Sequence, residues 1–169
     1  MKNSIYLIAI LVLTSCSCKK TTSQKLIAAL ESDCPKDGTC TVEVLDNKKL
    51  NVKQDEFGSI YYELEDNFDT KVVKYKYSRT VKGNLQDAGY REEIVFEIEN
   101  TLKDISLTDS DIQNTKMLFG RFCYCKGQTG NYKVSKGNLI FNSKENTIDL
   151  DFKVTEVPQI ITKIKLSLK

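Results

Sequence analysis

The chain has 169 residues, with 25 lysine and arginine side chains against 23 aspartate and glutamate side chains and a formal net charge of +2. This near balance gives no general attraction to nucleic acid, so we expect no nucleic-acid partner. The sequence has no histidine and no tryptophan, which excludes Ser-His-Asp and Cys-His catalysis as well as histidine-ligated metal sites.

The first 20 residues have the pattern of an export signal. Lys2 precedes an apolar run over 5–13 that is too short to span a bilayer as a mature helix. The segment Leu13-Thr14-Ser15-Cys16 follows, with small residues directly before the cysteine. It resembles the lipobox of bacterial lipoproteins.

This resemblance implies a division of the chain. Residues 1–15 would be the signal peptide, Cys16 would carry the lipid, and 16–22 would form a flexible tether to a single β domain at 23–169. The implied location is the cell envelope, where the lipid anchors the protein in the membrane. Ser17 favours the outer membrane, because retention at the inner membrane usually goes with aspartate at that place; the leaflet is left open.

The first part of the domain is expected to contain one helix and then two hairpins. Ser23 is a plausible helix N-cap, and 24–31 places apolar residues on one helical face. From Thr39 the apolar period is two, which predicts strands. We predict one hairpin with its turn at 46–48 and a second that joins the alternating segments 60–64 and 73–77, with Glu63 close to Lys74.

Alternation continues through the rest of the chain. It predicts strands at 92–99, 132–134, 138–142 and 147–154, and a last strand after Pro158 whose lysines suit a sheet edge. The segment 101–114 is rich in turn formers and is predicted to be a connection with room for one helical turn. Because 115–125 is apolar on both faces, it is predicted to be a central, doubly covered strand.

Together these elements predict an all-β fold. We expect an antiparallel β-sandwich or a partly closed barrel of about eight to ten short strands with one short N-terminal helix. The pattern does not separate sandwich from barrel.

Four cysteines of the domain are expected to form disulfides in an oxidising compartment: Cys34, Cys40, Cys123 and Cys125. In an extended strand Cys123 and Cys125 would have Cα atoms about 6.5 to 7 Å apart, which disfavours a bond between them. We therefore expect both to pair with Cys34 and Cys40.

Other roles for these cysteines are weaker. A metal site made by all four lacks the usual Cys-x2-Cys spacing, so we expect no metal. A redox-active pair is disfavoured because no Cys-x-x-Cys occurs. A third alternative pairs Cys34 with Cys40 and leaves Cys123 and Cys125 reduced or strained.

One stretch concentrates unusual residues and is a candidate binding patch: Arg121, Tyr124, Lys126, Gln128 and Tyr132. The alternative is that the aromatic residues are core and the cations mark strand ends. The alternating lysines and tyrosines of 71–79 could bind a protein, but Glu63 and Glu65 on the predicted neighbouring strand would already pair with those lysines, which favours a solvated face.

No motif predicts catalysis. Carboxylate pairs such as Glu92 and Glu93 have spacings that any solvated strand produces. We therefore expect a non-catalytic binding or assembly component without a cofactor, with another envelope protein as a possible partner. The alternative is a glycan-acting hydrolase that uses two carboxylates in a deep cleft.

Overall fold

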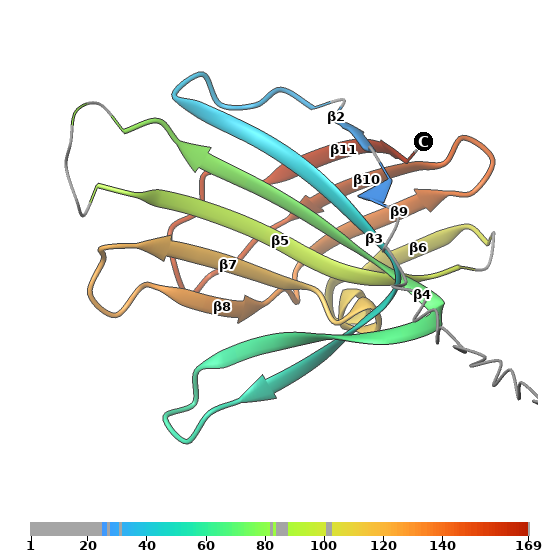
Figure 1. The fold of residues 1–169 in the computed structure, drawn as a ribbon, viewed down its shortest axis with the longest axis horizontal. Helices are drawn as coiled ribbons and strands as arrows, with labels where there is room; N and C mark the ends of the chain where they lie inside the picture. The colour runs from blue at the N-terminus through green and yellow to red at the C-terminus, as the bar shows by residue number, and fades with distance from the viewer. Residues whose placement is uncertain are drawn as a thin grey trace, which may run out of the picture.

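The computed structural model describes residues 25–26, 28–30, 32–81, 83, 88–100 and 103–168, and it confirms an all-β protein (Figure 1). The expected signal peptide, Cys16 and tether lie outside these residues. One antiparallel sheet has the order β1-β3-β4-β5-β7-β8 and comprises Lys25–Leu26 (β1), Gly38–Gln54 (β3), Ile60–Arg79 (β4), Tyr90–Glu99 (β5), Leu118–Cys123 (β7) and Gly130–Lys133 (β8). The other has the order β2-β11-β10-β9-β6 and comprises Ala28–Leu30 (β2), Ile105–Thr108 (β6), Gly137–Asn142 (β9), Thr147–Phe152 (β10) and Lys163–Leu168 (β11).

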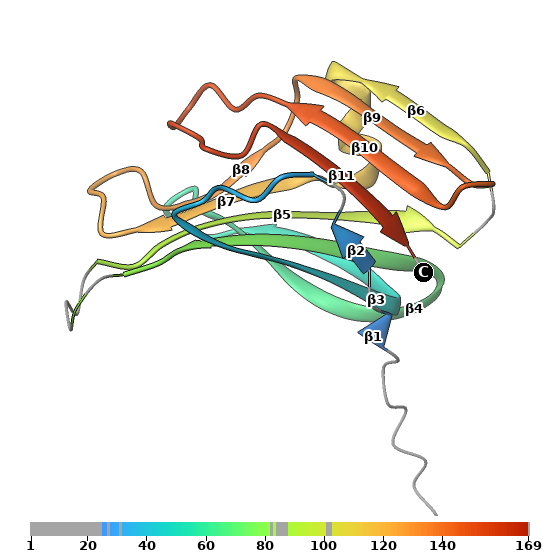
Figure 2. The same ribbon diagram turned by 90° about the horizontal axis from the view of Figure 1, so that it is seen from above.

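The main hydrophobic core lies between the two sheets, which form two layers in Figure 2. Alternate residues of each strand point into it, and those of β4, β5 and β10 are Val73, Tyr75, Tyr77, Ile94, Phe96, Ile98, Ile148, Leu150 and Phe152. The rings of Phe119 in β7 and Phe152 in β10 lie 5.9 Å apart between centroids and join the layers. The alternation predicted for 92–99 and 147–154 is therefore confirmed.

The two predicted hairpins are wrong, because β3 and β4 are two long strands that pair with each other from Gly38↔Arg79 to Gln54↔Ile60. The turn lies at 55–59, where Asp55 accepts hydrogen bonds from backbone N–H groups. The predicted turn at 46–48 is a β-bulge at which the register shifts.

The outer half of this hairpin, 48–54 with 60–66, has its own ion pairs. Glu63 lies opposite Asn51 and 2.5 Å from the Lys53 ammonium, so its predicted place near Lys74 is wrong. Glu65 forms an ion pair with Lys49 at 3.2 Å. The bulge bends the hairpin so that this half crosses the face of the first sheet turned away from the core (Figure 1).

A second, smaller core fills the space under the bent hairpin. Leu50 packs there with Val72, Val95 and Leu118, which come from β4, β5 and β7. Ile60 pairs with Asn131 of β8, and this contact partly closes the first sheet on itself. The face of β5 and β7 that a simple two-layer protein would leave in water is therefore partly covered.

Two further predictions differ from the structure. The N-terminal helix is wrong: β1 pairs with β3 and β2 pairs with β11, so the chain crosses from one sheet to the other and its backbone bonds go to their edges. The helical turn of the described chain is instead a 3-10 helix, Asp109–Thr115 (η1), within the predicted connection. The last strand is not an edge, because β11 lies between β2 and β10.

The predicted disulfide pairing is also wrong. Cys34 bonds to Cys40 and Cys123 bonds to Cys125. Strand β7 ends at Cys123 and the chain bends at Tyr124, so the Cα atoms of Cys123 and Cys125 are 5.2 Å apart rather than at extended-strand spacing.

The part of the chain that the structure describes contains no helix with the length and hydrophobicity that a membrane span requires.

Candidate functional site

The candidate site is a groove on the face of the first sheet that points away from the second sheet; we call it the outer groove. It encloses about 460 Å³. Four strands contribute its main lining residues, which are Glu43, Lys74, Lys76, Arg91, Glu93 and Phe122. Tyr62 of the bent hairpin also lines it, so the groove begins where the second core ends.

The strand register brings these side chains together. Lys76 of β4 lies opposite Glu93 of β5. Arg91, two residues before Glu93 in β5, lies opposite Phe122 of β7. Since side chains alternate between the faces of a sheet, all of these residues point away from the main core, whereas Ile94, the next residue of β5 after Glu93, points into it. The alternating pattern thus places polar residues on one face of a strand whose other face is core.

Glu93 is the centre of the charges in the groove. Its carboxylate lies 2.9 Å from Arg91 Nε and 3.4 Å from Lys74 Nζ. Burial lowers the pKa of Lys74, but Tyr62 and Glu93 more than offset this, so the pKa lies above its ordinary value. Lys74 therefore stays charged, and the carboxylate of Glu93 is held between two cations.

Two cations of the groove retain donors for a ligand. Lys76 makes no hydrogen bond or ion pair with any residue that the structure describes. Within that same part of the chain, the two terminal nitrogens of Arg91 make no hydrogen bond either. With Lys74, Lys76 and Arg91 against Glu43 and Glu93, the lining carries one excess positive charge.

An aromatic ring forms one wall beside these donors. The Arg91 guanidinium carbon lies 4.3 Å from the centroid of the Phe122 ring, a cation–π contact. The ring in turn lies over Gly120, where an added Cβ would be 2.6 Å from Phe122 Cε2 and 2.9 Å from Asn131 Oδ1. Glycine at position 120 therefore permits this ring position.

A second, shallower pocket of about 530 Å³ continues the groove toward the end of the sheet. It shares Arg91 and Phe122 with the groove and adds Arg79, Tyr90 and Cys123. The Arg79 guanidinium carbon lies 4.7 Å from the centre of the Tyr90 ring. The pocket therefore contains two pairs of a cation and an aromatic ring, Arg91 with Phe122 and Arg79 with Tyr90.

Beneath this pocket, between the sheets, lies a buried polar network. Glu92 is fully buried and accepts hydrogen bonds from the backbone N–H groups of Ile160 (2.7 Å) and Ile161 (2.8 Å). The Tyr90 hydroxyl also donates to it at 2.5 Å, and burial, with this bond, raises the pKa of Tyr90. These bonds satisfy the carboxylate, which ties the loop before β11 to β5.

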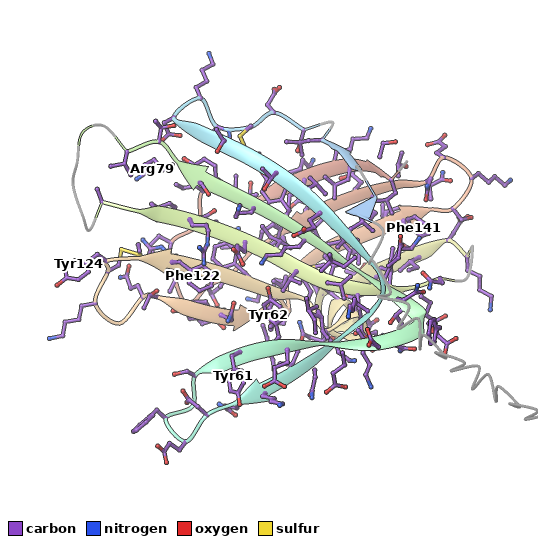
Figure 3. All side chains as sticks on the ribbon, in the orientation of Figure 1. Tyr61, Tyr62, Arg79, Phe122, Tyr124 and Phe141 are labelled. Carbon is purple, nitrogen blue, oxygen red and sulfur yellow. A yellow bond between two sulfur atoms is a disulfide. The ribbon has the colours of Figure 1, made fainter. Side chains whose placement is uncertain are left out.

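The five residues of the predicted patch do not form one surface. Arg121 is only 8 % exposed and donates hydrogen bonds to Gln128 Oε1 and the Tyr90 hydroxyl. Tyr132 packs against the main core. Tyr124 is 84 % exposed and lies at the end of the molecule (Figure 3). Lys126 is also exposed.

The sequence does not reveal the outer groove, because it predicts other ion-pair partners for the lysines of β4. Glu63 and Glu65 were expected to neutralise the lysines of β4, but they pair with Lys53 and Lys49 on the bent hairpin. One signal could have located the groove: Lys74 and Lys76 alternate with the core residues Tyr75 and Tyr77, so the two lysines share the face of β4 that points away from the core. That signal becomes specific only when the register with β5 is known.

The carboxylates give the hydrolase alternative no support at this site. Glu92 and Glu93 point to opposite faces of β5, one into the core and one into the groove. Glu93 is held by two cations, as described above. Among the described residues no group of three or more cysteine, aspartate or glutamate side chains is arranged to hold a metal ion.

No protein-family model, no curated protein and no solved structure matches the chain.

Proposed function

We propose that this chain is a lipid-anchored, non-catalytic protein of the cell envelope. Ser17, the residue after the lipidated Cys16, would direct it to the outer membrane, and the outer groove would bind an acidic segment of another envelope protein. The observation that carries the binding proposal is a pair of cations with donors available for a ligand. Lys76 makes no hydrogen bond or ion pair with the described residues, and the two terminal nitrogens of Arg91 make no hydrogen bond there, although its Nε contacts Glu93. The domain would present them from a β-sandwich whose first sheet is partly closed by the bent hairpin.

The chemistry of the pair favours a carboxylate ligand. The planar fork of Arg91 donates to a carboxylate through two parallel N–H groups, and the Lys76 ammonium adds a point charge beside it. Phe122 offers an apolar wall, so a segment with an acidic and an apolar residue would contact both. Each cation already has a fixed place on a strand, which reduces the ordering cost of binding.

A zero-length crosslinker tests this proposal. A carbodiimide joins a lysine amine to a carboxylate that touches it, so treatment of intact membranes should join the partner to Lys76, as mapped by mass spectrometry. Lys76→Gln should abolish this adduct. Lys153→Gln is the matched control, because Lys153 is exposed beyond β10 and outside the groove.

Two results would contradict the binding proposal. One is an adduct whose yield is the same in Lys76→Gln as in the unchanged protein. The other is an adduct that maps to Lys153 and to other exposed lysines as often as to Lys76. Arg91→Gln should also reduce the yield at Lys76, because it removes the fork that positions the carboxylate.

The lipid anchor has its own test. Cys16→Ala removes the thiol that would carry the lipid, and the protein should then move from the membrane fraction to the soluble fraction. Cys18→Ala, two residues away, should leave the protein in the membrane fraction. Sedimentation of the Cys16→Ala protein with membranes would refute lipidation at Cys16.

A further inference from the structure

We propose that the Cys123–Cys125 disulfide is a thiol–disulfide exchange site for a dithiol of a partner protein. The two disulfides of the chain differ in their surroundings. Cys123 lines the shallow pocket at the end of the sheet, together with Arg79, Arg91 and the rings of Tyr90 and Phe122. This inference goes beyond the carboxylate-binding role and does not depend on it.

Because of its position, the Cys123–Cys125 bridge can open with little loss of folding stability. Its cysteines are separated by two positions in sequence, against six for Cys34–Cys40, so it constrains the unfolded chain least. Strand β7 is held independently, by pairing of Cys123 with Tyr90 and of Arg121 with Gly130. Reduction would therefore leave the strand, and the pocket beside it, in place.

The pocket supplies what the exchange step needs. An attacking thiolate and a leaving thiolate are both negative, and positive groups nearby stabilise such species. Arg79 and Arg91 provide that charge, although each also has one carboxylate partner, Asp37 and Glu93. Tyr90 and Phe122 form apolar walls for the peptide that carries the thiol.

The step balances as a two-electron exchange. A thiolate of the partner attacks Cys123 Sγ, a bond forms between these sulfurs, and the Cys123–Cys125 bond breaks to release Cys125 as a thiolate. The partner's second thiolate then attacks the partner sulfur that is bonded to Cys123. A disulfide forms within the partner, the bond to Cys123 breaks, and Cys123 leaves as a thiolate. The partner dithiol is oxidised to a disulfide, and one equivalent of this chain is reduced to the Cys123 and Cys125 dithiol.

Glutathione is the probe for the first test. The full chain is equilibrated over a series of ratios of reduced to oxidised glutathione, free thiols are alkylated, and each cysteine is assigned by peptide mass spectrometry. We expect Cys123–Cys125 to open at a ratio about tenfold lower than Cys34–Cys40. Opening of both bridges at one ratio, or of Cys34–Cys40 first, would overturn the proposal.

Single-cysteine variants test the direction of attack. In Cys125→Ser the thiol of Cys123 faces the pocket and should form the mixed disulfide with oxidised glutathione faster than Cys125 does in Cys123→Ser. Arg79→Gln should slow this reaction, whereas Lys153→Gln should not. Equal rates for the two single-cysteine variants, or no effect of Arg79→Gln, would show that the pocket does not direct the exchange.

Discussion

Glu97 accepts a hydrogen bond from the backbone N–H of Leu50 at 2.6 Å, so a side chain of β5 holds the bent half of the β3–β4 hairpin. Lys116 adds two contacts at the same place. Its ammonium lies 2.7 Å from the Glu97 carboxylate and donates a hydrogen bond to the Leu50 carbonyl at 3.0 Å. Leu50 and Leu64 face each other across the hairpin, and the side chain of Leu50 fills the second core. The hairpin is thereby fixed at its bend.

Glu97→Ala is expected to loosen this hairpin. The loss of a charged acceptor for a partly buried N–H should cost about 2 kcal/mol in the free energy of unfolding. The backbone amide of Leu50 should exchange with deuterium faster, as measured by native-state NMR. Lys53→Ala, which breaks a more exposed ion pair of the same hairpin, should cost less stability than Glu97→Ala and leave exchange at Leu50 unchanged. Equal effects of the two variants would contradict this account.

The bend also shows why the sequence predicted strands better than it predicted their connections. Asp46 and Asn47 are turn formers, and Asn47 does adopt a left-handed φ of 57°. A bulge and a turn both need such a residue, so local sequence does not distinguish them. The difference lies in the partner: β4 pairs with β3 on both sides of the bulge, which makes one long hairpin of two predicted ones.

The site depended on the same missing information. The alternation correctly separated the core tyrosines of β4 from its lysines, yet the neighbours of those lysines follow from the register with β5, which sequence periodicity does not give. A bond between Cys123 and Cys125 is disfavoured only if the strand continues in extended form to residue 125. Because β7 ends at Cys123, this condition does not hold, and the disfavoured bond is the one that the structure contains.

Gly120→Ala is expected to damage the outer groove. The new methyl group would overlap the Phe122 ring and the Asn131 side chain, so the ring must move from its place beside Arg91. We expect a loss of about 1 to 3 kcal/mol in stability, typical of overpacking, and a lower carbodiimide adduct yield at Lys76. Gly89→Ala is the control, since no atom lies within 4 Å of its added Cβ. An unchanged adduct yield in Gly120→Ala would show that the ring position does not matter for binding.

Glu92→Ala is expected to be the most destabilising of these changes. It removes the acceptor of a buried N–H group, that of Ile161, and of two partly buried donors, the Ile160 N–H group and the Tyr90 hydroxyl. Unsatisfied buried groups cost about 1 to 3 kcal/mol each, so a total loss of about 3 kcal/mol or more is expected in urea unfolding. Glu92→Gln keeps one acceptor oxygen and should lose less, and Glu145→Ala, on an exposed turn, should be nearly neutral. A small effect of Glu92→Ala would mean that water replaces the carboxylate.

Asp37 is expected to make stability depend on pH in the acid range. The hydrogen bond from the Tyr77 hydroxyl, at 2.7 Å, is the main cause that lowers the pKa of Asp37, and Arg79 contributes as well. The unfolded chain therefore takes up this proton at higher pH than the folded protein does. The stabilisation is present above the ordinary pKa of 3.8 and is lost as the pH falls through the lowered value.

Asp37→Asn removes this titration, so the urea midpoint of the variant should fall less than that of the unchanged protein as the pH is lowered below about 4. Well above that pH the variant should be the less stable protein, because the charged contact with Arg79 is lost. Asp111→Asn is the control, because Asp111 is exposed on η1 and has no hydrogen bond through its side chain to the described residues. If the midpoints of Asp37→Asn and the unchanged protein fall in parallel, Asp37 does not carry the acid sensitivity, and another carboxylate with a lowered pKa, Asp104 beside Ser143, becomes the next to test.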